Sequence, residues 1–202
     1  MICCDTSIRK ALRTKQNNLL NPYRFGGGVA PVYTTWNPAD KYTGCTLSGA
    51  NLLTTFTSQN GLVRSVASVS VGKWYWEVTL TAGAGGVGVI KGTESLTQFL
   101  GNAVTGYSYF NNGYKFNNGV FTLIETYAAV TTIGVMLDMN AGEISFRKNG
   151  VAVGGVAFSG LTGIFYATVG TNGTTYPSHT ANFGASAFGS TPPAGYNAGL
   201  YT

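Results

Sequence analysis

The chain has 202 residues, of which 9% are charged, 44% hydrophobic and 13% aromatic. This length suits one large domain, or one domain with a short arm, rather than two ordinary domains. Long surface helices usually carry many Lys, Glu and Arg side chains, so the low charge argues against a helical bundle. The plentiful aromatic and β-branched residues exclude disorder for most of the chain.

The sequence contains no stretch approaching 18 consecutive apolar residues, so we expect no membrane insertion. Asp5, Arg9 and Lys10 lie where a signal peptide would be apolar, and we therefore expect folding in a reducing cytoplasm. The cysteines are Cys3, Cys4 and Cys45. With His179 as the single histidine, no zinc-ligand spacing exists, and we expect no metal and no cofactor.

The charge is concentrated at the beginning of the chain. Residues 1–24 carry five basic residues and one acidic residue, whereas 25–202 carry seven basic and six acidic residues. The nearly neutral remainder argues against a nucleic-acid partner. Apolar spacing in the first segment predicts a short helix that stops at Asn21-Pro22, before a glycine-rich joint.

A helix of about 12 residues is marginal by itself in water, so it must pack on another surface. We therefore predict that residues 1–28 are a basic attachment arm. The arm residues expected to make contacts are Ile8, Arg9, Leu12, Arg13 and Leu19.

From residue 29 onward, apolar and polar residues alternate with the period of a β-strand. The clearest cases are Lys73–Leu80, Thr132–Met139 and Glu143–Lys148, and Asn-Gly pairs typical of hairpin turns separate many segments. Further strands are expected at Val29–Trp36, Leu62–Val71, Gly86–Lys91, Gly106–Phe110, Ile164–Thr171 and His179–Phe183. Because no crossover helices are present, we predict an all-β, antiparallel sandwich over residues 29–202.

Several of these segments resemble a known family. The Lys-Trp-Tyr-Trp-Glu strand within 72–78 and the Leu-Asp turn, Ile-Ser-Phe strand and Lys-Asn-Gly turn within 133–150 resemble SPRY domains. Residues 181–196 resemble the closing segment of SPRY domains in bacteriophage proteins, whereas residues 1–28 have no counterpart. The resemblance implies a concanavalin-like bent sandwich that binds proteins through loops at one edge.

A search for catalytic groups gives no convincing set. Glu77 and Glu143 could form a glycosidase-type pair only through tertiary contact, and solvated strand faces are the simpler expectation. Asp138 is expected to close a turn, and His179 to be structural. The glycines of 83–88 echo a dinucleotide-binding loop but lack a following helix, so we expect a bend between strands. We predict no catalytic residues.

The remaining candidate is a contact surface rich in aromatic and amide side chains. Aromatic rings bury a large area at low entropic cost and are therefore frequent in interfaces. The predicted binding edge comprises Tyr107, Tyr109, Asn111, Asn112 and Tyr114. Tyrosine rings and asparagine amides also suit sugar binding.

Three functions are compatible with this pattern. The first is a non-enzymatic structural component of a bacteriophage virion, made in the host bacterial cytoplasm and present in several copies. Its arm would fasten a SPRY-like domain to the capsid or tail scaffold, as a capsid decoration, head fibre or tail-associated protein. The second is a tail-fibre module that binds a host-surface glycan or receptor. The third, a glycan-cleaving enzyme, needs two converging acids.

Overall fold

The computed structural model describes residues 30–171, 173 and 175–201. The predicted helical arm, with Ile8, Arg9, Leu12, Arg13 and Leu19, lies outside these residues. Residues Val32–Thr202 form one compact unit, which we call the body of the protein.

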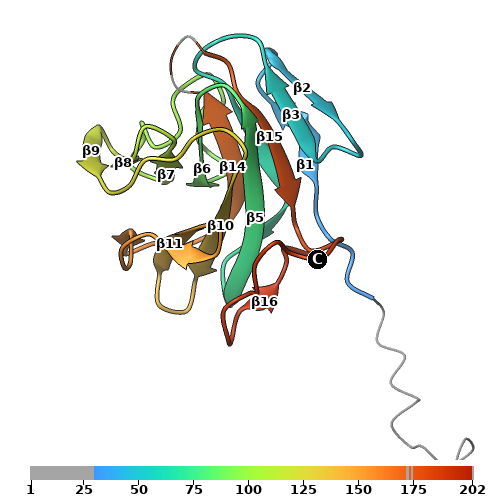
Figure 1. The fold of residues 1–202 in the computed structure, drawn as a ribbon, viewed down its shortest axis with the longest axis vertical. Coiled ribbons are helices and arrows are strands. Elements are labelled where there is room, and N and C mark those ends of the chain that lie inside the picture. Colours follow the sequence, from blue (N-terminus) through green and yellow to red (C-terminus); the bar gives the residue numbers. More distant parts are fainter. Residues whose placement is uncertain (1–29, 172, 174, 202) are drawn as a thin grey trace, which may run out of the picture. The chain divides into compact units, whose positions relative to one another are not determined.

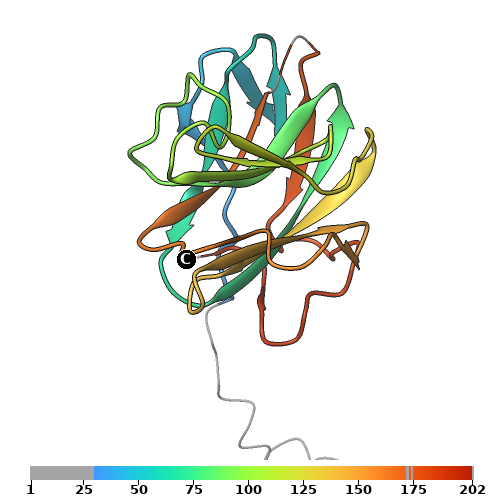
Figure 2. The ribbon, with the colours of Figure 1, turned by 90° about the vertical axis from the view of Figure 1, so that its left-hand side faces the viewer.

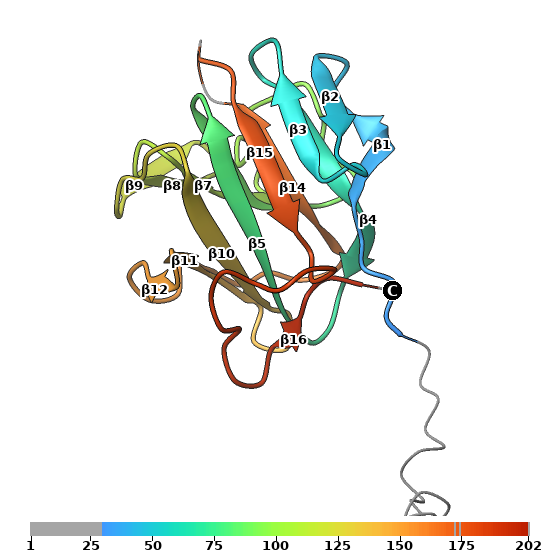
Figure 3. The same ribbon diagram turned by 45° about the vertical axis from the view of Figure 1, so that its right-hand side comes forward.

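The body consists of two β-sheets (Figures 1 and 3). In spatial order, the seven-stranded sheet contains β1 (Trp36–Lys41), β4 (Leu62–Val69), β14 (Phe165–Thr171), β6 (Gly85–Ile90), β7 (Gly106–Phe110), β8 (Tyr114–Asn117) and β9 (Val120–Leu123). The nine-stranded sheet contains β12 (Val151–Ala152), β11 (Glu143–Lys148), β10 (Thr131–Asp138), β5 (Lys73–Ala82), β15 (Ser178–Asn182), β3 (Leu53–Phe56) and β2 (Cys45–Ser48). Two short strands complete it: β13 (Phe158–Ser159) on β11, and β16 (Asn197–Ala198) on β5.

The predicted all-β antiparallel architecture is confirmed. The pairs within both sheets are antiparallel, apart from the parallel pairing of β16 with β5. The described residues contain no helix, and therefore none that could span a membrane. The β10–β11 hairpin and the β11–β12 turn are found as predicted, and Asn149 and Gly150 adopt the positive φ angles of 48° and 84° that a type I′ turn needs.

The first strand differs from the prediction. Within the described part of the segment expected to form a strand at Val29–Trp36, Tyr33 makes only an isolated bridge to Tyr201, and β1 begins at Trp36. The amide of Thr34 donates its hydrogen bond to the carbonyl of Leu200 (2.9 Å) near the end of the chain, so this segment pairs with the C-terminal residues before β1 joins β4. The short strands β2 and β3 were not predicted, because neither shows a long run of alternation.

The main core lies between the two sheets. Trp76, Val78 and Leu80 on β5 point inward, as their alternation predicts, and meet Val87 and Val89 from β6 in one buried cluster. Most of these side chains are almost fully buried, and each large one removes enough apolar surface from water to contribute about 1.5–3 kcal/mol.

A second cluster covers the outer face of the seven-stranded sheet. Ile90, Phe110 and Phe116 point away from the main core and pack against Leu96 and Leu100 of the segment that joins β6 to β7. The middle of this sheet is therefore buried on both faces, which is why β6 is buried along its entire length.

The C-terminal segment covers the outer face of the nine-stranded sheet at β5. The ring of Phe188 packs edge-on against Tyr75, with centroids 5.1 Å apart. Both oxygens of the Glu77 carboxylate accept hydrogen bonds from this segment, from the backbone amides of Gly189 (2.8 Å) and Ser190 (2.9 Å). These contacts cover the outer face of the nine-stranded sheet at β5, whereas outward residues of the neighbouring strands, such as Thr55 on β3 and Thr180 on β15, remain exposed.

Candidate interaction surface

Two of the five predicted contact residues are part of the packed interior. Tyr109 is fully buried, its ring lies 5.0 Å from that of Tyr127, and its hydroxyl donates a hydrogen bond to the carbonyl of Glu125. Burial, aided by the negative charge of Glu125, raises the pKa of Tyr109 above its usual value. Tyr107 is half-buried, with its ring 5.3 Å from that of Phe158, and burial raises its pKa as well.

The two asparagines lie in the turn between β7 and β8. Asn111 is structural, because its side-chain oxygen accepts a hydrogen bond from the amide of Gly85 (3.1 Å) and its backbone carbonyl accepts one from Tyr127 (3.0 Å). Asn112 is exposed, and its side-chain oxygen accepts a hydrogen bond from the amide of Tyr114 (3.3 Å). Of the predicted set, Asn112 and Tyr114 therefore lie nearest to solvent.

Tyr114 belongs to a hairpin formed by β8 and β9. Asn118 and Gly119 make the turn, with φ angles of 49° and 76°, so the turn is again of type I′. Phe121 on β9 stacks on Phe116 on β8, with centroids 3.9 Å apart and ring planes only 7° from parallel. Figure 2 presents the side of the body that carries this hairpin.

All four residues of β9 are exposed, although three of them are large and apolar. Val120, Phe121 and Leu123 have 63%, 52% and 61% of their surface exposed. The ring of Tyr114 lies edge-on to Phe121 at 6.0 Å. We call the surface formed by Tyr114, Val120, Phe121, Thr122 and Leu123 the β9 edge.

The charged groups closest to the β9 edge are engaged elsewhere. Lys115 donates a hydrogen bond to the carbonyl of Ala157 (2.6 Å), and its ammonium lies 5.1 Å from the centre of the Phe158 ring. Glu125 forms an ion pair with Lys148. The β9 edge is thus an uncharged, apolar strip at the margin of a sheet, a combination typical of interaction sites.

The acids considered for catalysis are not brought together. Glu77 on β5 is paired in register with Gly134 on β10, and Gly134 with Arg147 on β11. Glu143 lies four residues from Arg147 along β11, or about 13 Å. One strand, β10, also lies between the two strands that carry the carboxylates, and this arrangement does not match the separations found in glycosidases.

Glu77 also differs from the solvated residue that the sequence predicts. It is only 4% exposed, because the C-terminal segment covers it, and the hydroxyl of Tyr75 donates a further hydrogen bond to its carboxylate (2.8 Å). Burial and this hydrogen bond raise the pKa of Tyr75 above its usual value.

Asp138 closes a turn, as predicted, by accepting hydrogen bonds from the amides of Asn140 (3.0 Å) and Ala141 (3.1 Å). Burial by itself would raise its pKa, but Lys73, 2.7 Å away, and these amides outweigh that effect and lower the pKa.

His179 is structural, as predicted: it is fully buried, with Nδ1 3.4 Å from the hydroxyl of Thr54. Burial lowers its pKa to about 3, so the ring is neutral at physiological pH.

The glycine-rich segment at 83–88 is a bend into β6, as predicted. At Gly83, a Cβ atom would lie 2.1 Å from the carbonyl oxygen of Tyr176, so this close approach requires glycine. Within residues 30–171, 173 and 175–201, no group of three or more His, Cys, Asp or Glu side chains is arranged to hold a metal ion.

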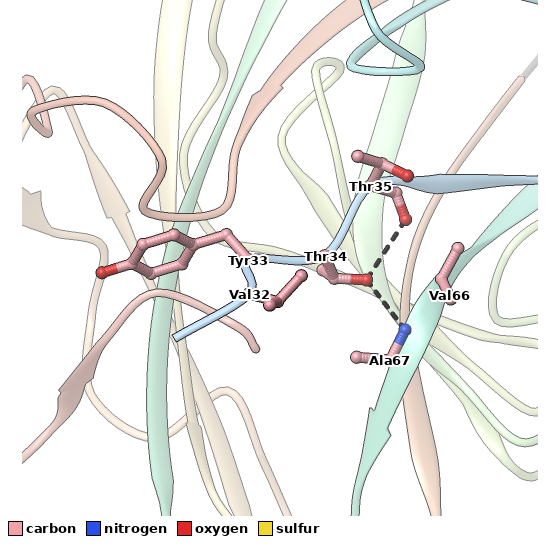
Figure 4. A pocket seen from close by; sticks show the side chains of 6 residues that line it. All are labelled: Val32, Tyr33, Thr34, Thr35, Val66 and Ala67. Carbon is pink, nitrogen blue, oxygen red and sulfur yellow. Dashed lines mark hydrogen bonds between the residues drawn. The ribbon is translucent and has the colours of Figure 1, made fainter. Parts of the chain in front are cut away.

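The hollows of the body differ in the groups that line them. One of about 310 Å³ lies beside β4, between exposed Val32 and Val66 (Figure 4). The hydroxyl of Thr34 accepts a hydrogen bond from the amide of Ala67 (2.8 Å), and no charged group lines the hollow. A second, of about 440 Å³, is lined by Lys91, Ile164 and Tyr166 among others. Neither gathers several converging polar groups. A third hollow, of about 330 Å³, does gather polar side chains, namely Glu143, Ser145, Arg147 and Tyr196. We consider the β9 edge the stronger candidate because three large apolar residues are exposed there on one strand.

Comparison with known proteins supports the fold and gives the family. The family model described as "SPRY domain" matches residues 73–186, which is more than half of the chain. No curated protein matches the sequence.

Two solved structures are similar to the body. The SPRY domain of human HERC1 is 19% identical, with a TM-score of 0.62, and the match covers 72% of this chain and 96% of that one. The PSpry domain of TRIM65 is 15% identical, with a TM-score of 0.63, and the match covers 75% of this chain and 92% of that one. At these identities the structures show the shared fold alone. The family match, together with the two antiparallel sheets, establishes that this chain belongs to the SPRY domain family of protein-interaction modules.

Proposed function

We propose that this chain is a non-enzymatic interaction module of a bacteriophage virion, and that its body makes contacts through the β9 edge. Residues 1–28 would attach it to the capsid or tail scaffold, as a decoration, head fibre or tail-associated protein. The observation that carries the proposal is the exposure of three large apolar residues on one edge strand, Val120, Phe121 and Leu123.

This surface suits a protein partner better than other ligand classes. An exposed strand at a sheet margin offers unpaired backbone groups, and an added strand can bind these groups while its side chains cover the apolar ones. A nucleic acid would require basic residues, which the β9 edge lacks.

Two sequence features support the virion assignment. Residues 181–196 resemble the closing segment of phage SPRY domains, and the basic arm at 1–24 is distinct in charge from the body. Synthesis in the host cytoplasm, followed by incorporation into the particle, accords with the near absence of cysteine from the body.

The test is incorporation into purified particles. We expect the full chain to be found in particles by mass spectrometry, and a variant lacking residues 1–24 to be lost from them while remaining folded. The matched control replaces residues 1–24 by an uncharged sequence of the same length. Incorporation of the truncated body would contradict the attachment role of the arm, and absence of the full chain from particles would refute the virion assignment.

Binding to a host-surface glycan is the second candidate, favoured by the exposed Asn112 next to the ring of Tyr114. A glycan array with the purified body separates the two. Binding that is lost in Asn112→Ala and Tyr114→Ala, and kept in Leu123→Lys, would favour glycan recognition over a protein contact at the β9 edge.

A further inference from the structure

The two margins of the seven-stranded sheet are built differently. β1 carries Pro38, Asp40 and Lys41, and its pairing with β4 is irregular between Trp36 and Lys41. Proline, charge and bulges are the usual devices that keep a sheet margin from pairing with another strand. β9 contains none of these, although it is short, and Figure 1 shows it as the outermost strand on its side of the body.

The hairpin turn determines which backbone groups of β9 are unpaired. In a two-residue hairpin, the residues that flank the turn form a hydrogen-bonded pair, here Asn117 and Val120. Such pairs recur at every second residue, and the hydrogen bond from Ile124 N to Gly113 O (2.8 Å) fits this pattern. The N–H and C=O groups of Phe121 and Leu123 therefore point away from β8, and no described residue pairs with them.

This arrangement is complementary to itself. If a second β9 lies antiparallel to the first with Thr122 opposite Thr122, Phe121 of each copy faces Leu123 of the other. Each Phe121–Leu123 pair can then exchange two hydrogen bonds. The four outward groups of each strand, which are the N–H and C=O groups of Phe121 and Leu123, are then all paired. Shifting the second strand by two positions would leave either Phe121 or Leu123 of each copy without a partner in the other β9.

The side chains agree with the same register. Phe121 and Leu123 lie on one face of the sheet with Phe116 and Tyr114 of β8, so the second copy would extend this apolar row. On the opposite face, Thr122 would meet Thr122, a favourable cross-strand pair, and Val120 would meet Ile124. No like charges come into contact, because β9 is uncharged.

We propose that two copies of this chain associate through the β9 edge, as an antiparallel pair of β9 strands with Thr122 on the two-fold axis. The inference names the partner at the interaction surface proposed above and rests on that surface being a contact site. Two four-residue strands bury little area, so the association depends on concentration and is favoured where many copies are held close together.

Disulfide trapping tests the register directly. The test uses the full chain with Cys3→Ser and Cys4→Ser, to which Thr122→Cys is added. In the proposed pair the two residues at position 122 form a non-hydrogen-bonded pair, whose Cα atoms are about 4.5 Å apart, which is within disulfide range. The matched control is Val120→Cys on the same strand and face, whose two copies would lie about 13 Å apart. Under mild oxidation we expect at least about tenfold more covalent dimer from Thr122→Cys. Equal yields, or none from Thr122→Cys, would overturn the proposed pairing.

Leu123→Lys separates this inference from the proposed function. In sedimentation experiments it should weaken self-association at least about tenfold, because it places a charged side chain opposite Phe121 of the other copy and brings two like charges to diagonal positions on the same face. The control is Val151→Lys on β12, which changes an equally exposed valine on the other sheet. If Leu123→Lys prevents incorporation into particles while Thr122→Cys gives no dimer, the β9 edge binds a different protein and only the pairing is wrong. If Leu123→Lys changes neither property, the β9 edge is not a contact surface, and both the pairing and the contact role proposed for this edge fail; the arm truncation tests the virion assignment separately.

Discussion

At the centre of the nine-stranded sheet a carboxylate is buried, whereas at the margin of the seven-stranded sheet three large apolar side chains are exposed. Glu77 is tolerated inside because Tyr75, Gly189 and Ser190 donate hydrogen bonds to it. Phe121 and its neighbours on β9 have no comparable cover. The buried carboxylate is thus held by donors within the body, whereas the exposed apolar side chains of β9 leave surface for a partner outside it.

The largest expected effect is at Glu77. Glu77→Ala removes the acceptor for the buried hydroxyl of Tyr75 and for the amides of Gly189 and Ser190, and we expect it to lower the free energy of unfolding by about 3 kcal/mol. Urea denaturation measures the change. Glu143→Ala is the control, since Glu143 lies on the same sheet and is only half-buried. Similar losses in the two variants would contradict the anchoring role of Glu77.

A pH-dependent effect is expected at His179. Its pKa is about 3 in the folded state and near 6.5 when unfolded, so between these values the unfolded chain binds more protons. The free energy of unfolding should therefore fall as the pH drops from 6.5 towards 3, by up to about 1.4 kcal/mol per pH unit from this group.

His179→Gln removes this contribution while leaving the carboxylates in place. Denaturation curves of both proteins at about pH 7 and about pH 4.5 should show a smaller loss in the variant. The same loss in both proteins would show that the folded state binds the proton as readily as the unfolded chain.

A smaller effect is expected at Tyr109. Tyr109→Phe keeps the buried ring but leaves the carbonyl of Glu125 without this donor, which should cost about 1 kcal/mol. Tyr107→Phe is the matched control on the same strand. Because Tyr109 is buried, we expect no effect on binding to a partner. A binding defect without loss of stability would show that Tyr109 is a contact residue after all.

The smallest effect on stability is expected at β9. Leu123→Lys changes an exposed position, so the free energy of unfolding should change by less than about 0.5 kcal/mol. Thermal unfolding of dilute protein measures this. A loss of more than about 2 kcal/mol would show that Leu123 belongs to the core of the body rather than to its contact surface.

The hairpin of β10 and β11 could be predicted from the sequence because two local signals agree there. The apolar residues alternate in both strands, and Asp138 closes the turn between them by accepting hydrogen bonds from the amides of Asn140 and Ala141. The strands β2 and β3 could not, since each has only four residues, and β3, which holds β2, depends on long-range pairing with β15. Local pattern gives little information where a strand is held by distant neighbours.

The contact surface was predicted only in part. Alternation indicates that half of the residues in a strand face inward, and for Tyr107 and Tyr109 the sequence does not say which half. The outer face of the sheet is also covered, so Phe110 and Phe116 are buried on the side opposite to Tyr109. Conversely, Val120–Leu123 has the composition of a core strand, and only the topology shows that, among the residues that the structure describes, no strand lies beyond it.

The hydrogen bonds of Glu77 also bear on how far the folded unit extends. The family match ends at residue 186, yet two donors to this carboxylate, Gly189 and Ser190, come later in the chain. Leu200 in turn accepts a hydrogen bond from the amide of Thr34 (2.9 Å), well before the match begins. A fragment trimmed to the matched residues would lose β1–β4 and leave Glu77 uncovered, so a recombinant version of the body needs both flanks to fold.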